Sequence, residues 1–263
     1  MSELILCEEQ DYIAILMLNR AAKHNAMSPD MLVAMRDHLQ RLEAEGATRV
    51  LIIRGQGTKA FTSGYDIGHL PERQGNERLT QRHQPNTFSD MLVALRKFSA
   101  PVIAMIHGFC MGGGLELAAT CDIRISADTG TFRMPPARLG VLYSGDGLLR
   151  FMNLIGVANT NEIFFTACTF DAERARDMGL VNHVVAAADL EQATYDMARQ
   201  IAHNAPLSVK HTKQVLGMVQ SFQDFTRHQD EMQRLREFCM NSDDFQEGRR
   251  AFLEKRQPVF QGR

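Results

Sequence analysis

Three consecutive glycines, Gly112–Gly114, constrain this chain more than any other feature, because they stand between two apolar segments. The segment Pro101–His107 predicts a buried strand, and Gly108–Gly114 predicts a glycine-rich turn after it. Leu115–Thr120 then predicts a short helix, and Ile123–Ser126 predicts another strand. The order of strand, tight turn, helix and strand indicates an α/β fold.

Hydrophobic periodicity and capping residues predict the other elements. Ser28 is expected to cap a helix that begins at Pro29, the favoured position for proline, and stops before Gly46. Asp146 is expected to cap a later helix. The remaining predictions are a hairpin of Leu4–Cys7 and Tyr12–Leu18 with a turn at Glu8–Asp11, a strand at Val50–Ile53, an irregular segment at Gly55–Gly68, a helix at Asn86–Phe98, helices at Leu148–Ile155, Asn159–Thr166 and Asp171–Met178, a strand at Val181–Val185, and helices at Leu190–Asn204, Leu207–Gln220 and about Phe222–Cys239.

Length and composition narrow the class of protein. We expect the 263 residues to form an α/β core over residues 1–186 and a helical region over residues 187–263. With 29 basic and 31 acidic residues, a net charge of −2 and no long charged block, the chain is not expected to bind nucleic acid. No apolar run reaches the roughly 18 residues of a membrane helix, and the N-terminus lacks a targeting pattern, so we expect a cytoplasmic protein without a membrane partner. Five scattered cysteines predict reduced thiols and no metal site.

Two motif hypotheses are weak. Gly55–Ala60 fits the dinucleotide-binding pattern G-x-G-x-x-A, but that pattern requires a helix, and Ser63, Gly64 and Pro71 argue against one there. A serine hydrolase would need G-x-S-x-G, whereas the residue two before Ser144 is a leucine.

The glycine run is better suited to hold an oxyanion. At a helix N-terminus the first N–H groups have no intrahelical acceptor and attract negative charge. If the helix begins at about Gly113, Glu116 lies on the same face, so a carboxylate stands beside an anion-stabilising N–H group. This pair suits enolate chemistry on a carbonyl compound. A solvated carboxylate in the first helical turn is the alternative, but the apolar neighbours of Glu116 favour a buried functional group. The loop Ala60–Ile67, with glycine at position 64, could supply a second N–H donor to the same oxygen.

Several motifs occur in order along the whole chain. They are N-R…N-A-M (Asn19–Met27), A-F-x-S-G-x-D-I (Ala60–Ile67), P-V-I-A…G-x-x-x-G-G-G-x-E-L-A…C-D (Pro101–Asp122) and F-Q-E-G-x-x-A-F-L-E-K-R-x-P-x-F (Phe245–Phe260). Together they resemble the crotonase, or enoyl-CoA hydratase/isomerase, superfamily.

The resemblance implies a crotonase-like spiral of ββα units with a helical C-terminal trimerisation region, assembled as a homo-trimer or a dimer of trimers. It implies an acyl-CoA substrate and no cofactor, because coenzyme A enters as the substrate thioester. The thioester oxygen would accept hydrogen bonds from the backbone N–H groups of Tyr65 and Gly113. The implied CoA contacts are Ala60, Ser63, Gly64, Asp66 and Ile67 of the loop, Lys23, and Phe252 and Lys255 of the last helix, the latter pair from the same or a neighbouring subunit.

One departure from the family pattern bears on the reaction. Hydratases of the family carry a second glutamate about twenty residues after the first, and Pro136 occupies that position here, where it cannot transfer a proton. Ser144 stands where dienoyl isomerases and aryl-CoA dehalogenases carry a catalytic aspartate. The stretch Thr131–Tyr143 is most similar to the methylmalonyl-CoA decarboxylase branch, which also has the proline and a tyrosine matching Tyr143. That branch has a histidine at the position of Tyr65.

The branch implies decarboxylation of a short malonyl-type CoA, with Glu116 and Tyr143 as the catalytic residues. Decarboxylation needs no base in its first step, only stabilisation of the enolate that remains. Tyr143 would orient the substrate carboxylate, although a core tyrosine with a satisfied hydroxyl is an equal alternative. Two other functions stay open: hydration of an enoyl-CoA by Glu116 alone, and binding of a CoA ester without catalysis.

Overall fold

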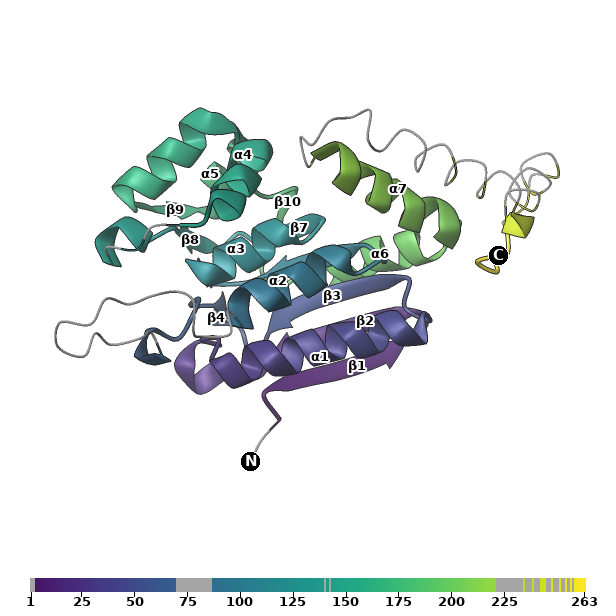
Figure 1. Ribbon diagram of the computed structural model, residues 1–263, viewed down its shortest axis with the longest axis horizontal. Coiled ribbons are helices and arrows are strands. Elements are labelled where there is room, and N and C mark those ends of the chain that lie inside the picture. Colours follow the sequence, from purple (N-terminus) through teal and green to yellow (C-terminus); the bar gives the residue numbers. More distant parts are fainter. Residues whose placement is uncertain are drawn as a thin grey trace.

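The protein folds around two β-sheets (Figure 1). A computed structural model describes residues 3–69, 87–139, 141 and 143–220, together with residues 234, 238, 242–244, 247, 251, 254, 256 and 258–263. The larger sheet has the order β1-β2-β3-β5-β7-β10 and the smaller sheet the order β4-β6-β8-β9. The larger sheet comprises β1 (Ile5–Gln10), β2 (Ile13–Leu18), β3 (Val50–Gly55), β5 (Val102–Ile106), β7 (Ile123–Ala127) and β10 (His183–Val185). The smaller sheet comprises β4 (Ala60–Thr62), β6 (Phe109–Met111), β8 (Thr131–Arg133) and β9 (Thr169–Asp171).

From β3 to β8, successive strands alternate between the two sheets. The strands β3, β5 and β7 pair in parallel in the larger sheet, and the strands that directly follow them, β4, β6 and β8, pair in parallel in the smaller one. Each pair of strands leads into a helix, so the chain repeats a ββα unit. The spiral of ββα units predicted for the chain is therefore confirmed.

Helices cover both faces of the larger sheet. The α-helices are α1 (Pro29–Glu45), α2 (Thr87–Lys97), α3 (Gly113–Thr120), α4 (Gly145–Thr166), α5 (Ala172–Asp177), α6 (Leu190–Ala202) and α7 (Pro206–Gln220), and the short 3-10 helices are η1 (Ala21–Lys23), η2 (Ile67–His69) and η4 (Pro136–Leu139). Buried side chains of α1, α2 and α3 share one hydrophobic core with alternate residues of the sheet. Side chains of α6 form a second cluster on the opposite face. In Figure 1, α4 and α5 lie together beside β8 and β9.

The first helix forms as its capping residues predict. The Ser28 side chain accepts a hydrogen bond from the Met31 N–H, Pro29 occupies the first helical position, and Gly46 ends the helix with a left-handed φ of +67°. The hairpin is also confirmed, but its turn was predicted too early. Asp11 and Tyr12 both have positive φ, as a two-residue hairpin turn requires, so β1 continues to Gln10.

Short strands and one cap differ from prediction. Strands β4 and β6 lie within segments predicted as irregular or as a glycine turn, and neither β8 nor β9 was predicted. The two helices predicted at Leu148–Ile155 and Asn159–Thr166 are confirmed, because α4 consists of two helical stretches that meet in a kink at the non-helical Gly156. The expected cap at Asp146 is wrong, because Ser144 caps α4 by accepting from the Gly147 N–H.

Among the described residues, no helix is both long and apolar enough to cross a membrane. The helix predicted at about Phe222–Cys239 lies, apart from isolated positions, outside the described residues, and the predicted division at residue 186 stays a prediction.

Candidate active site

Three loops meet at one edge of the smaller sheet, because β4, β6 and β8 are parallel neighbours and their carboxyl ends lie side by side. Ser63–Tyr65 follow β4, and Gly112 and Gly113 follow β6. Pro135 and Pro136 come shortly after β8, and the Gly112 N–H donates to the Arg133 carbonyl of that strand. Residues far apart in sequence therefore converge at this edge.

Two backbone donors face each other across this edge. The Tyr65 N and the Gly113 backbone are close enough that a Cβ built on Gly113 would stand 3.3 Å from the Tyr65 N. Gly113 is the first residue of α3, so its N–H has no acceptor within the helix. Met27 and Tyr65 form a parallel bridge in which the Met27 N–H donates to the Gly64 carbonyl and the Asp66 N–H donates to the Met27 carbonyl. The Tyr65 N–H lies between these two bonds and points away from Met27. Neither the Tyr65 N–H nor the Gly113 N–H has an acceptor among the described residues.

Glycine is required where these loops approach each other. Gly64 has a φ of +99°, and a Cβ there would stand 2.6 Å from the Met111 carbonyl oxygen. A Cβ on Gly114 would stand 2.4 Å from Thr62 Cγ2. Real Cβ atoms do not approach so closely, so side chains at these positions would force the two donor loops apart.

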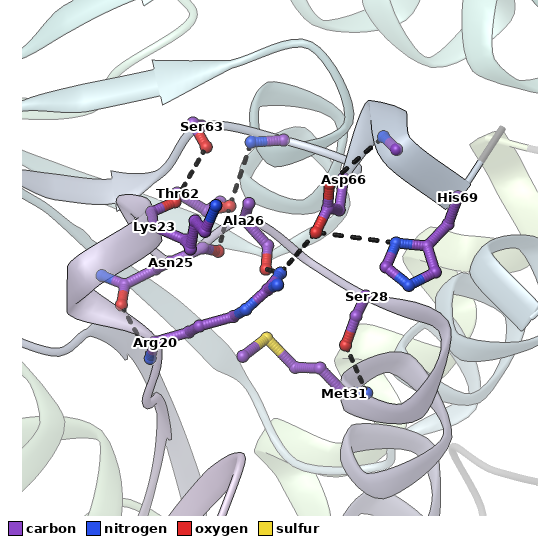
Figure 2. Close-up of polar contacts among 12 residues, drawn as sticks. Arg20, Lys23, Asn25, Ala26, Ser28, Met31, Thr62, Ser63, Asp66 and His69 are labelled. Carbon is purple, nitrogen blue, oxygen red and sulfur yellow. Dashed lines mark hydrogen bonds and ion pairs between the residues drawn. The ribbon is translucent and has the colours of Figure 1, made fainter.

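A buried asparagine holds both ends of β4 (Figure 2). Asn25 is fully buried with a φ of +54°, and its side-chain amide donates to the carbonyls of Gln56 at 3.1 Å and Ala60 at 2.8 Å. Its carbonyl oxygen Oδ1 accepts from the Arg20 N–H at 3.1 Å. The Thr62 hydroxyl donates to the Asn25 backbone carbonyl at 2.7 Å and accepts from the Gly64 N–H at 3.0 Å. Asn25 thus fixes the segment that carries the Tyr65 donor.

Replacing Asn25 with alanine is expected to lower the free energy of unfolding by about 3 kcal/mol, because three buried or partly buried hydrogen bonds are lost at about 1 kcal/mol each. Denaturant unfolding monitored by circular dichroism checks this value. Asn161→Ala on an exposed position of α4 is the control, with an expected change within about 0.5 kcal/mol. Equal losses for the two variants would contradict the role of Asn25.

Glu116 is the buried carboxylate of this site. It lies on α3 one turn after Gly113, and only 6% of its surface is exposed. Burial raises the pKa of Glu116, while a hydrogen bond from Tyr143 and the charges of Arg150 and Arg96 oppose that rise. None of the groups that shift this pKa is a second carboxylate. A proton can therefore reside on Glu116 closer to neutral pH than on an exposed glutamate.

Tyr143 lies against Glu116 just before α4 begins. Its pKa is raised far above the ordinary value by burial, by the charge of Glu116 and by the hydrogen bond to it. The ring packs edge-to-face on Phe164 with a centroid distance of 5.2 Å. A Cβ on Gly147 would stand 2.9 Å from the Tyr143 ring and 3.0 Å from Glu116 Oε1, so Gly147 leaves room for the pair.

The other predicted site residues surround these groups. Pro136 is buried at the start of η4, after β8, where the family's second glutamate was expected. Lys23 is exposed on η1 beside the donor loop, and its carbonyl accepts from the Ser63 hydroxyl at 3.5 Å. Ala60 is buried in β4, and Ile67 begins η2. Phe252 and Lys255 lie outside the described residues.

Comparison with known proteins decides the family. The profile of the enoyl-CoA hydratase/isomerase family matches residues 8–263. The chain belongs to this family. Methylmalonyl-CoA decarboxylase of Escherichia coli K12 is 35% identical over 258 residues, which cover 95% of this chain and 95% of that protein. Short-chain-enoyl-CoA hydratase of Clostridium acetobutylicum is 31% identical over 252 residues, which cover 96% of this chain and 95% of that protein.

Solved structures agree with the fold. A crystal structure of an enoyl-CoA hydratase/carnithine racemase from Magnetospirillum magneticum superposes with a TM-score of 0.89 at 30% identity, covering 100% of this chain and 97% of that one. An enoyl-CoA hydratase from Bacillus anthracis gives the same TM-score and identity, covering 99% of this chain and 100% of that one. The crotonase fold expected from the motifs is confirmed.

Sequence reasoning missed several residues that support the site in this family member. Arg150 on α4 donates to the Thr120 hydroxyl, which in turn donates to the Glu116 carbonyl at 2.7 Å. The positive charges of Arg150 and of Arg96 on α2 both act on the Glu116 carboxylate. No local pattern marks either arginine, because their roles arise from the packing of α2 and α4 against α3.

Proposed function

We propose that this protein decarboxylates a short malonyl-type CoA, such as methylmalonyl-CoA. The observation that carries the proposal is the pairing of Glu116 with the Tyr143 hydroxyl, in a site where Pro136 stands at the position of the family's second glutamate. The 35% identity with the methylmalonyl-CoA decarboxylase of Escherichia coli supports it.

The two backbone donors suit the first step. When the bond between the α-carbon and the carboxylate breaks, CO2 leaves and the bonding electrons move into the thioester carbonyl, giving an enolate. The N–H groups of Tyr65 and Gly113 would donate to its oxygen, which is more negative in the enolate than in the substrate. This interaction strengthens as the reaction proceeds, so it lowers the barrier rather than merely tightening binding.

Tyr143 can bind the substrate carboxylate, and Glu116 can supply the proton that the product requires. The Tyr143 hydroxyl has a single proton to donate, and it donates that proton to Glu116 when the carboxylate is ionised. When Glu116 is protonated, it can donate to the Tyr143 oxygen, which frees the tyrosine proton for the substrate carboxylate. After CO2 has left, Glu116 or a water molecule would deliver a proton to the α-carbon. One proton is consumed, and the product is the shortened acyl-CoA.

Hydration of an enoyl-CoA is the second candidate. Glu116 could deprotonate water by itself, and the 31% identity with the short-chain-enoyl-CoA hydratase of Clostridium acetobutylicum favours this reaction. Family hydratases use a second carboxylate to protonate the α-carbon, and Pro136 has no proton to give. We therefore place decarboxylation first. Binding of a CoA ester without turnover remains the third outcome to be tested.

The remaining parts of the proposal concern the bound molecule and the assembly. We propose that coenzyme A enters only as the thioester, with no separate cofactor, and contacts Lys23 and the Ala60–Ile67 loop. We further propose a homo-trimer or a dimer of trimers in the cytoplasm, in which Phe252 and Lys255 of the same or a neighbouring subunit complete the site. Sedimentation velocity of the purified protein tests the assembly.

Purified protein incubated with methylmalonyl-CoA, malonyl-CoA and crotonyl-CoA in parallel tests the reaction. We expect CO2 release from a malonyl-type thioester, no loss of the enoyl absorbance of crotonyl-CoA, and a fall of about 10- to 100-fold in CO2 release in Tyr143→Phe. Tyr195→Phe, a tyrosine of α6 outside the site, is the matched control. Hydration of crotonyl-CoA without CO2 release would establish the second candidate instead. Binding of all three thioesters without any product would establish the third.

A further inference from the structure

A single arginine connects the two segments that position the Tyr65 donor. Arg20 Nη1 lies 2.6 Å from Asp66 Oδ2 and donates at 3.1 Å to the Ala26 carbonyl. Asp66 directly follows Tyr65, and Ala26 directly precedes Met27, the residue that bridges to Tyr65. Figure 2 shows the Arg20 side chain extended between the two segments, with both contacts at its end.

The carboxylate of Asp66 is fully engaged in this arrangement. Its Oδ2 receives Arg20 and has His69 Nδ1 at 3.6 Å, while its Oδ1 accepts from the Gly68 N–H at 3.3 Å. The hydrogen bond from Arg20 lowers the pKa of Asp66, so the ion pair persists across the neutral range. These partners occupy the Asp66 carboxylate in holding the loop, so the CoA contact proposed for Asp66 would come from its backbone.

We infer that Arg20 is a positioning residue, which acts through Asp66 to hold the Tyr65 N–H toward the oxyanion. The inference rests on the proposed oxyanion hole and names a residue that supports it without touching substrate. The bridge to Met27 consists of two backbone hydrogen bonds only, from the Met27 N–H and the Asp66 N–H. Arg20 adds a side-chain contact at each end of this short ladder, the ion pair to Asp66 and the hydrogen bond to the Ala26 carbonyl. A displacement of about 1 Å in a donor can cost about 100-fold in rate.

This role predicts a specific imbalance between activity and stability. Both side chains are partly exposed, at 26% for Arg20 and 22% for Asp66, so the ion pair contributes little to the stability of the whole fold. Loss of alignment at the donor affects only the step in which the oxyanion forms. The expected signature is therefore a fall in kcat, with little change in the KM of the thioester or in Tm.

The kinetic experiment is a double-mutant cycle on Arg20→Met, Asp66→Asn and their combination. We expect each single variant to lower kcat by about 10-fold or more. The kcat of the double variant should be no lower than that of the less active single variant. Tm should fall by no more than about 4 °C. Arg20→Lys should recover part of kcat, because one nitrogen makes both contacts. Arg36→Met, which removes an exposed ion pair to Asp37 of 2.7 Å on α1, should leave kcat unchanged.

A measurement that needs no turnover separates this inference from the proposed function. Hydrogen exchange of peptides covering residues 24–28 and 60–69 should be about 10-fold faster in Arg20→Met and Asp66→Asn than in Arg36→Met. If the wild type converts none of the three thioesters, the proposed function fails, while faster exchange still supports the positioning role of Arg20. Unchanged exchange overturns the inference, as does a rise in KM at constant kcat, which would mean that Arg20 binds the substrate directly. If the wild type hydrates crotonyl-CoA, the same kinetic cycle applies, because addition of water to the enoyl thioester also forms a thioester enolate.

Discussion

Replacing Gly64 with alanine is expected to lower kcat by about 100- to 1,000-fold, the usual effect of losing one oxyanion donor. The added Cβ would stand 2.6 Å from the Met111 carbonyl oxygen and 3.3 Å from the Gly113 N. Both contacts are with backbone atoms, which cannot rotate away as a flexible side chain could. The loops after β4 and β6 must therefore separate, and the N–H groups of Tyr65 and Gly113 would no longer converge on one oxygen. Steady-state kinetics with the preferred thioester measure this loss.

Gly57→Ala is the matched control for this prediction. Gly57 has a φ of +76°, so alanine there meets a similar backbone strain, but the nearest atom to its Cβ, that of Ala21, is 4.0 Å away. The control should lose stability at about 1 kcal/mol and keep kcat within about threefold of the wild type. If Gly64→Ala behaves like Gly57→Ala, the two loops do not form the oxyanion site.

Elements whose signals are local could be predicted from the sequence. The helix at Pro29–Glu45 begins with a serine cap and a proline and ends at a left-handed glycine, and its apolar residues repeat at helical spacing. The buried strands of the larger sheet are continuous apolar runs, and such runs predict strands from the local sequence. In each case the residues that decide the structure lie within the element.

The smaller sheet could not be predicted in the same way. Its strands β4, β6, β8 and β9 have three residues each, too few to show a period of two. Their conformation depends on pairing with neighbours more than twenty residues distant, as Phe109 does with Thr131. The glycines correctly predicted the turns beside these strands. At those turns the two donor loops approach each other.

The same distinction holds within the site. Glu116 and Gly113 could be found because a glycine run, a helix start and a carboxylate occur within five residues. Arg20 and Asp66 are 46 residues apart, and nothing near either one indicates the ion pair. Asn25 stands within the motif N-R…N-A-M, and the signal that could have indicated its structural role is that asparagine tolerates positive φ.

The charge on Glu116 links the chemistry of the site to the stability of the fold. Burial raises the pKa of Glu116 above its ordinary value of 4.5, so the folded protein holds this proton more tightly than the unfolded chain. The protonated carboxyl stabilises the fold below pH 4.5, and that contribution is lost as the pH rises through the folded-state pKa. Arg150 and Arg96 limit the loss but do not remove it.

Glu116→Gln is therefore expected to lower kcat by about 100- to 10,000-fold while stabilising the fold at pH 8 relative to the wild type. Glutamine matches the shape of the protonated acid and still accepts from the Tyr143 hydroxyl, but it neither donates an acidic proton nor accepts one. The gain in Tm should shrink as the pH is lowered toward 4, where the wild-type carboxyl is itself neutral. Steady-state kinetics and thermal unfolding at both pH values measure the two effects.

Glu162→Gln, on an exposed carboxylate of α4, should change neither kcat nor the pH dependence of Tm. A Glu116→Gln enzyme with wild-type turnover would assign proton delivery to water and leave Tyr143 as the residue that orients the carboxylate. A Tm difference that is the same at pH 4 and pH 8 would instead mean that Glu116 is ionised in the folded protein at both values, with Arg150 and Arg96 fully offsetting its burial.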